Sequence, residues 1–340
     1  MTSISVLMCV YNRERYVSEA IESILNQSFR DFEFVIVVDG ATDRSLEIVQ
    51  SYAVKDARII VLVNDENIGI TRSNSKGLLK CQGRYIARMD SDDISLPDRL
   101  QIQFDHLETH PEIDVLGSAC KIINEKSEDT GDWISRPMDP LVIRYEMHYF
   151  CAIHNPTVMA RSSIYKKYNH NHLEEPHDSA EDYAFLTRVN FDHYFSNLPE
   201  CLLLTRHHSG QISIAKINYQ RESFLSVSHR SFESLLGKRL PKEAVKAFYF
   251  SERYTENDPI ILQQGLRIML QAHRKFEKEF RLIPDQRSEI RSFFYTKFKR
   301  YIMVYRKNSK VLLTGVLSLV LFFPGTLMKD LLTRIRKTSP

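Results

Sequence analysis

Short apolar runs alternate with amphipathic segments over the first 120 residues of the chain. Ile4–Val10 is almost continuously apolar, which predicts a strand covered on both faces. Apolar residues then recur on one helical face across Val17–Leu25. The same reasoning predicts strands at Phe32–Val38, Ile59–Val63, Tyr85–Met89 and Val115–Cys120, and helices at Asp43–Tyr52, Ile70–Cys81 and Pro97–Thr109. Thr42 is the expected cap of the second helix, and Ser95 and Pro97 are expected to open the fourth. This alternation predicts an α/β fold with a mainly parallel central sheet and helices on both faces.

The rest of the chain changes character twice. Residues 121–215 are less regular, with one helix predicted at Ala180–Asn190. Residues 216–306 are polar and basic and have a mostly helical pattern, whereas residues 311–323 are uncharged and mainly apolar. We therefore expect three parts: an α/β domain over residues 1–215, a basic helical extension over 216–306, and a membrane-associating segment over 307–340.

Charge is distributed unevenly along the 340 residues. The net charge is +3, but residues 231–340 hold 22 Lys and Arg against 10 Asp and Glu, a net of +12, so the preceding part is acidic. A basic tail suits an anionic lipid surface or a nucleic acid. The neighbouring apolar run favours the lipid surface, and no nucleic-acid partner is expected.

The cysteines and the N-terminal residues indicate which kinds of site and which cellular compartment to expect. The five Cys residues are scattered and form no CxxC pair, which argues against a zinc site or a disulfide framework and suits a reducing compartment. The N-terminal residues lack the basic and apolar stretches of a signal peptide.

Polar residues follow three of the predicted strands. The first strand ends in Tyr11-Asn12-Arg13, the second in Asp39-Gly40-Ala41-Thr42-Asp43, and the fourth in Asp90-Ser91-Asp92-Asp93. Ligands of doubly wound sheets bind beyond the carboxyl ends of the strands. Three acids in four residues repel one another, so a cation should offset the cost, and Mg²⁺ or Mn²⁺ with a diphosphate fits hard oxygen ligands. If the chain stays extended, Asp90 and Asp92 point to the same side. A turn or a helix cap remains the alternative reading of this cluster.

Two further polar sites, Glu181-Asp182 and His208, do not by themselves indicate a particular function. Glu181-Asp182 begins a predicted helix, where acids suit the helix dipole. His208 follows the apolar stretch Leu202–Leu204, and a single histidine there is usually a surface or core histidine with its hydrogen bonds satisfied. On position alone, both sites favour a structural role.

An ordered set of short motifs nevertheless resembles the family 2 inverting glycosyltransferases, which have the GT-A fold, a Rossmann-like arrangement. The resemblance spans about residues 3–215, and each motif is weak while the ordered set is specific. It is carried by Ser5–Asn12, Gln27–Phe29, Asp31–Glu33, Asp39–Asp43, Asn67–Gly69, Gly83–Asp93, Pro97–Leu100, His110–Glu112, Pro156–Met159, Glu181–Tyr183 and Arg206–Ser213.

The resemblance implies roles on the nucleotide side of a site. Asp39 matches the acid that accepts a hydrogen bond from the base of the donor, typically from uracil N3–H. Val10 and Tyr11 would line the base pocket. Arg72 and Arg88 are candidate charge partners of the nucleotide sugar.

It also implies roles in catalysis and metal binding. Asp90 and Asp92 match the DXD motif, with Asp92 the expected direct ligand of Mg²⁺ or Mn²⁺ and Asp90 nearer the ribose. His208 matches a histidine that helps to hold the metal or the diphosphate. Asp182 matches the catalytic base that takes the proton of the acceptor hydroxyl. The implied reaction moves a hexosyl or N-acetylhexosaminyl group from a nucleotide-diphosphate sugar, expected to be a UDP-sugar, to a glycan or lipid-linked glycan.

The chain departs from the family pattern at several positions. Val38 replaces the first of two usual acids, Ala41 replaces a common Ser, and Asn155 stands where His is frequent. The QxxRW motif of processive synthases is not found, which favours the addition of one sugar per cycle.

Two other function classes remain as alternatives. A non-catalytic nucleotide-sugar binding module would have no use for the base. A nucleotidyltransferase of related topology would usually show a Gly-rich loop after the first strand, and Tyr11–Arg15 contains no Gly.

The apolar run near the C-terminus predicts where the protein works. Thirteen helical residues span roughly 20 Å, less than the ~30 Å hydrocarbon core of a bilayer. Pro324 and Gly325 interrupt the run, and cations lie on both sides of it. We therefore expect a peripheral or monotopic attachment to the cytoplasmic face of the cell membrane rather than a single spanning helix. A C-terminal helix docked on the catalytic domain remains the alternative interpretation of this segment.

Overall fold

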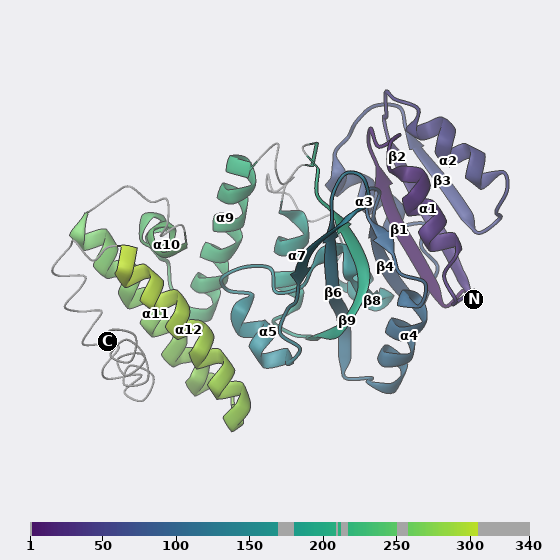
Figure 1. The fold of residues 1–340 in the computed structure, drawn as a ribbon. Coiled ribbons are helices and arrows are strands. Elements are labelled where there is room, and N and C mark those ends of the chain that lie inside the picture. The colour runs from purple at the N-terminus through teal and green to yellow at the C-terminus, as the bar shows by residue number, and fades with distance from the viewer. Residues whose placement is uncertain (1, 169–179, 209, 212–216, 250–257, 305–340) are drawn as a thin grey trace, which may run out of the picture. The chain divides into compact units, whose positions relative to one another are not determined.

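The computed structural model describes residues 2–168, 180–208, 210–211, 217–249 and 258–304. The chain divides into two compact units, residues 1–224 and residues 225–340 (Figure 1). The expected third segment, residues 307–340 with its apolar run 311–323, lies outside the described residues.

The first unit is built on one mixed sheet. Nine strands are described, and eight of them follow the order β3-β2-β1-β4-β8-β6-β9-β5, with β7 paired to β6. The strands are β1 (Ile4–Val10), β2 (Phe32–Asp39), β3 (Ile59–Asn64), β4 (Tyr85–Asp90), β5 (Ile94–Ser95), β6 (Ile113–Ile123), β7 (Asp129–Ile134), β8 (Met159–Arg161) and β9 (Tyr194–Arg206). The β3-β2-β1-β4 part is parallel, as the alternating pattern predicts. Beyond it, β8 pairs antiparallel with β4 and β6, while β6 and β9 run parallel.

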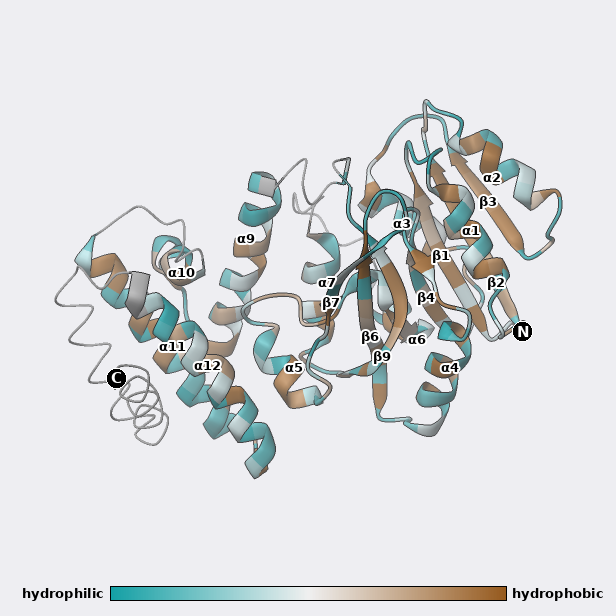
Figure 2. Ribbon diagram, viewed as in Figure 1, coloured by the Kyte–Doolittle hydropathy of each residue, from teal (hydrophilic) through white to brown (hydrophobic). Residues whose placement is uncertain are grey.

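The helices of this unit bury the residues that their periodicity predicts. In α1 (Val17–Leu25) the buried side chains are Val17, Ala20, Ile21 and Ile24, and they join the strands in one apolar core. Figure 2 shows that β1 and β2 are hydrophobic along most of their length. The other described helices are α2 (Ser45–Ala53), α3 (Ile70–Leu78), α4 (Arg99–Thr109), α5 (Pro140–Glu146), a 3₁₀ turn (Asn155–Thr157), α6 (Ser162–Lys167), α7 (Glu181–Val189) and α9 (Ile217–Leu236), which continues into the second unit.

Three predictions about helix ends are wrong. Ser95 does not begin a helix, because it belongs to the short strand β5, and α4 begins at Arg99, after Pro97. Thr42 does not cap α2; its main-chain N–H donates instead to Asn12 Oδ1 at 2.8 Å. The third helix ends at Leu78 rather than Cys81. For Ser95 and Thr42 the cause is a partner distant in the sequence, Leu203 of β9 and Asn12 respectively, which local pattern does not reveal.

The second unit is helical in its described part. It contains the remainder of α9 together with α10 (Lys242–Tyr249), α11 (Pro259–Glu279) and α12 (Pro284–Val304). Aromatic side chains fill its interior: His273 stacks on Phe294 with ring centroids 4.1 Å apart, and the Tyr301 hydroxyl donates to the Leu262 carbonyl at 2.7 Å. None of the helices in the described ranges has both the length and the hydropathy that a membrane crossing requires.

Candidate active site

The carboxyl ends of the parallel strands are aligned. In the register of the sheet, Val10 lies beside Val38, Cys9 beside Asp90, and Asp39 beside Asn64. The polar segments that follow β1, β2 and β4 therefore meet at one edge of the sheet, where ligands of such folds bind.

Asp39 is a buried acceptor that organises the next loop. Its Oδ1 accepts from Asn64 Nδ2 at 2.8 Å and from the Ile68 N–H at 2.9 Å, and its Oδ2 accepts from the Gly69 N–H at 3.0 Å. Gly40, with φ +60°, lets the chain leave Asp39 against the backbone of Glu66, where a Cβ atom would clash. A carboxylate accepts more bonds than these three, so Asp39 retains capacity for a ligand donor.

Asp92 lies between two cationic or polar side chains. Arg13 Nε donates to Asp92 Oδ2 at 3.1 Å, and His208 Nε2 lies 3.0 Å from the same oxygen. Burial raises the pKa of the Asp92 carboxyl, but the His208 hydrogen bond and the Arg13 charge outweigh burial and leave the pKa below its usual value. Asp92 is therefore ionised near neutral pH.

Contacts of the imidazole determine which nitrogen of His208 carries a proton. The Gly210 N–H donates to Nδ1 at 3.2 Å, so in the neutral ring Nε2 carries the proton that faces Asp92. The ring packs against Tyr16 with centroids 4.8 Å apart. His208 therefore lies beside Asp92, between the acidic cluster and Tyr16.

Asp93 has a different environment from Asp92. Its Oδ1 accepts from the Arg206 N–H at 2.8 Å, and its side chain is only 2% exposed. Burial raises the pKa of Asp93 well above its usual range, and the charges of Asp92 and Asp90 add to the rise. Asp93 therefore joins the loop to β9 rather than facing a ligand.

Asp182, in the first turn of α7, belongs to the same electrostatic cluster as Asp90. Burial raises the pKa of Asp90 to about 6, and the charges of Asp92 and Asp182 contribute to the rise. Burial also raises the pKa of Asp182, against the hydrogen bond from the Tyr183 N–H at 2.7 Å and the charge of Arg88. Proton acceptors in active sites commonly have raised pKa values of this kind.

Arg88 is the cation of this cluster. It lies in β4, it is 6% exposed, and its Nη1 atom is buried without a hydrogen-bond partner in the described part of the chain. Its charge lowers the pKa values of Asp90, Glu181 and Asp182. A buried donor without a partner beside carboxylates is a position where an anionic or hydroxyl-bearing ligand fits.

The remaining predicted residues lie at the same edge of the sheet with different exposure. Val10 is fully buried at the end of β1, and Tyr11, the next residue, is 44% exposed. Arg72 is exposed in the first turn of α3, just after the loop that donates to Asp39.

Sequence reasoning assigned no role to three residues that the structure places in this site. Arg13 pairs with Asp92, Arg206 bonds to the acidic loop, and burial raises the pKa of Glu181 to about 8, with the Asp182 charge adding to the rise. Arg13 directly follows a strand end, which could have identified it. Arg206 is the last residue of β9 and opens the motif Arg206–Ser213, but its bond to the acidic loop joins residues 114 positions apart, which no local pattern predicts.

The fit of a metal depends on Asp92 and His208. Asp92 Oδ2 is a suitable oxygen donor for Mn²⁺ or Mg²⁺, and His208 Nε2, 3.0 Å from it, could join as a ligand if the metal replaces the proton that Nε2 directs at Asp92. Among the described residues, no group of three or more His, Cys, Asp or Glu is arranged to hold a metal ion. A metal here would therefore need additional oxygens from a ligand or from water.

Comparison with known proteins identifies the family. Residues 5–169 match the model of glycosyl transferase family 2. An uncharacterised glycosyltransferase of Haemophilus influenzae is 32% identical over 242 residues, which cover 69% of this chain and 75% of that protein. The amylovoran biosynthesis glycosyltransferase AmsE of Erwinia amylovora is 28% identical over 217 residues, which cover 62% of this chain and 78% of that protein.

Solved structures share the fold. The crystal structure of S. aureus TarS 1–349 in complex with UDP-GlcNAc has a TM-score of 0.61 and 21% identity, and the match covers 92% of each chain. The mannosyltransferase PcManGT of Pyrobaculum calidifontis in complex with GDP-Man and Mn²⁺ has a TM-score of 0.51 and 14% identity, covering 94% of this chain and 87% of that one. The α/β architecture is therefore the GT-A type, and the chain belongs to glycosyltransferase family 2.

Proposed function

We propose that this glycosyltransferase moves one hexosyl or N-acetylhexosaminyl group per cycle from a nucleotide-diphosphate sugar to a hydroxyl of a glycan or lipid-linked glycan. A UDP-sugar is the proposed donor, and TarS, which shares the fold, binds UDP-GlcNAc. The similarity to a glycosyltransferase of amylovoran biosynthesis supports a polysaccharide product.

The observation that carries this proposal is the electrostatic contact between Asp182 and Asp90. The charge of Asp182 on α7 raises the pKa of Asp90 at the end of β4, and the charge of Arg88 lowers the pKa values of both carboxyls. A binding module would need the β4 carboxylate but not the second one. This pairing favours catalysis over the alternative of a non-catalytic nucleotide-sugar binding module.

The proposed donor site uses the aligned strand ends. Asp39 would accept a hydrogen bond from the base, with Val10 and Tyr11 beside it, and Asp90 would lie near the ribose. Arg88 offers its buried, unpartnered Nη1 to the sugar or the diphosphate. Arg72, exposed at the start of α3, is proposed as a more distant charge partner.

The proposed metal ligands are Asp92 and His208, with Asp90 nearby. A bound Mg²⁺ or Mn²⁺ would neutralise charge on the leaving nucleoside diphosphate. The hydrogen bond from Arg13 orients the Asp92 carboxylate and favours its ionised form. The hydrogen bond from the Gly210 N–H to Nδ1 selects the tautomer of His208.

The proposed chemical step is a single in-line displacement that inverts the anomeric carbon. Asp182 takes the proton from the incoming acceptor hydroxyl as the new bond forms on the face opposite the leaving diphosphate. Its raised pKa brings the carboxylate closer to the basicity that this transfer requires. The protein otherwise contributes position and fixed charge.

A panel of nucleotide sugars tests the proposal. We expect metal-dependent hydrolysis of one UDP-sugar, and NMR of the transfer product should show an inverted anomeric configuration. Tight nucleotide-sugar binding with no hydrolysis and no transfer to any glycan would favour the binding module instead.

We also propose that the basic and apolar C-terminal segment attaches the enzyme to the cytoplasmic face of the membrane, close to a lipid-linked acceptor. The support is the run 311–323 with cations on both sides. The test compares membrane fractionation of the full chain with that of a chain ending at Lys307. If both remain in the supernatant at low salt without detergent, the attachment is refuted.

A further inference from the structure

Arg136 lies in the segment between β7 and α5, and its guanidinium carbon is 5.2 Å from the centre of the Phe150 ring. Its Nε atom is buried and has no hydrogen-bond partner among the described residues. No ion pair links Arg136 to a carboxylate within the described ranges either. Arg13 and Arg206 differ in this respect, because Arg13 pairs with Asp92 and Arg206 pairs with Glu19.

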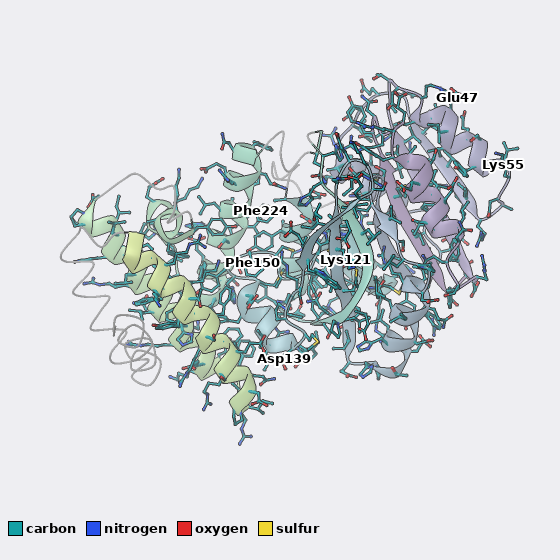
Figure 3. All side chains as sticks on the ribbon, in the orientation of Figure 1. Glu47, Lys55, Lys121, Asp139, Phe150 and Phe224 are labelled. Carbon is teal, nitrogen blue, oxygen red and sulfur yellow. The ribbon has the colours of Figure 1, made fainter. Side chains whose placement is uncertain are left out.

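Hydrogen bonds bring this segment close to the end of α5. Asn197 Nδ2 donates to the Pro137 carbonyl at 2.7 Å and to the Ala152 carbonyl at 3.1 Å, so the residues after Arg136 and after Phe150 lie side by side. Figure 3 labels Phe150, which follows α5, and Asp139, which caps its start.

The same end of α5 contacts the helix that carries the proposed base. Tyr183 directly follows Asp182 in the sequence. Its hydroxyl donates a hydrogen bond to the Met147 carbonyl at 2.8 Å. Cys151 connects the two regions electrostatically: burial raises the pKa of its thiol, the charge of Asp182 raises it further, and the charge of Arg136 lowers it. Arg136 is therefore connected, through the segment after α5, to the start of α7, which carries Asp182.

Among the described residues, no carboxylate forms a hydrogen bond or an ion pair with Arg136. The side chains that feel its charge are Cys151, Cys120 and His154. Burial lowers the pKa of His154 to about 4, with Arg136 contributing, so this histidine is neutral. A partly buried cation without a counter-ion is costly, and the cost is offset when an anion binds.

We propose that Arg136, stacked on Phe150, binds a phosphate or carboxylate group of the acceptor, so that the acceptor of this enzyme is an anionic glycan or glycolipid. This inference rests on the proposed function, because it requires the α7 side of the site to receive the acceptor. An arginine fork suits both groups, since each accepts two parallel hydrogen bonds. Stacking on an aromatic ring fixes the plane of the fork.

The test measures binding of three matched probes by saturation-transfer NMR, with and without UDP: methyl β-glucoside, methyl β-glucuronide and methyl β-glucoside 6-phosphate. The full chain should bind at least one charged glycoside roughly tenfold more tightly than the neutral one, as expected for a charge-assisted hydrogen bond. The glucuronide and phosphate arms distinguish a carboxylate-bearing acceptor from a phosphate-bearing one. Equal binding of all three, or no binding of the charged probes, overturns the proposal.

Variants separate this site from the donor site. Arg136→Gln should abolish the charge preference and leave UDP binding unchanged, whereas Arg136→Lys should keep part of the preference. The control Arg15→Gln removes an exposed arginine that pairs with Glu125 and should change neither. If Arg136→Gln weakens UDP binding as much as glycoside binding, the anion is the donor diphosphate and the proposal fails.

Two further readouts keep the test decisive. Since Arg136 forms no ion pair within the described ranges, Arg136→Gln should melt at the same temperature as the unaltered chain or higher, and a large drop in Tm would indicate a structural role instead. A chain that shows the charge preference but never binds UDP would refute the proposed donor and leave this inference standing.

Discussion

Arg206 Nε donates a hydrogen bond to the main-chain carbonyl of Asp92 at 2.7 Å. The arginine is 1% exposed, and its other nitrogens reach the Asn124 carbonyl, Ser127 Oγ and Glu19. Its guanidinium also lies over the Tyr16 ring, which packs against His208. One side chain in β9 therefore fixes the backbone of the acidic loop from behind the proposed metal ligands.

Replacing this arginine should destabilise the first unit. Arg206→Met leaves buried carbonyl groups without donors, so we expect a loss of about 3 kcal/mol or more in the free energy of unfolding, measured with urea. The control Glu19→Gln removes a half-exposed charge partner and should cost about 1 kcal/mol or less. Similar stability of Arg206→Met and the unaltered chain would mean that water replaces the guanidinium without cost.

Asp182→Asn should abolish transfer while donor affinity changes little. The amide keeps the shape of the side chain but cannot take a proton, and loss of a general base typically lowers the rate by about 10²–10⁴. Turnover is compared with the donor Kd from calorimetry on the same preparation. Near-normal turnover with intact donor binding would exclude Asp182 as the base.

Donor binding should require Mg²⁺ or Mn²⁺ through Asp92. Asp92→Ala removes the carboxylate that Arg13 and His208 share, so metal-dependent donor binding should be lost, whereas Glu47→Ala, at an exposed pair with Arg44, should have no effect. Calorimetric titration of UDP with and without Mn²⁺ measures the difference. Full activity in excess EDTA would show that the acidic loop has a structural role.

Glu181 should make the stability of the unliganded chain fall as the pH rises. Burial raises its folded-state pKa from 4.5 to about 8, so between these values the folded chain holds a proton that the unfolded chain has released. Stability then decreases with pH across this window. Glu181→Gln removes the titration, and its Tm should exceed that of the unaltered chain at pH 8 by more than at pH 5. If the Tm values of the two proteins change with pH in parallel, Glu181 has the same pKa in the folded and unfolded states, and the prediction is wrong.

The first half of the sheet was readable from sequence because its strands are buried on both faces and separated by amphipathic helices. Ile4–Val10 and α1 needed only hydrophobic periodicity. In contrast, β5 and β8 have two and three residues, too short for any periodicity, and β7 is exposed along most of its length. The pairing of β6 with β9 depends on contacts between residues about 80 positions apart, which no local window contains.

The candidate site divides in the same way. Asp39, Asp90 and Asp92 follow strand ends, so topology predicts that they meet. The roles of Asp182 and His208 rest only on the family resemblance, because the position of each residue in the sequence favours a structural role. The prediction that Asp90 and Asp92 point to the same side required an extended backbone. The chain instead turns at Ser91–Asp92. The charge of Asp92 nevertheless still raises the pKa of Asp90.

The distance along the chain between Asp92 and His208 has a consequence for biosynthesis. The two residues are 116 positions apart, and Arg206 is 114 positions from the carbonyl that it holds. Contacts of such long range form late, and a growing chain adds its residues in order from the N-terminus. The ribosome must therefore release β9 before the acidic loop gains its partners, and until then three neighbouring carboxylates repel one another without Arg206 or His208 beside them. A nascent chain paused before β9 also leaves β6 without its parallel partner, and an unpaired strand edge of this kind is prone to aggregation.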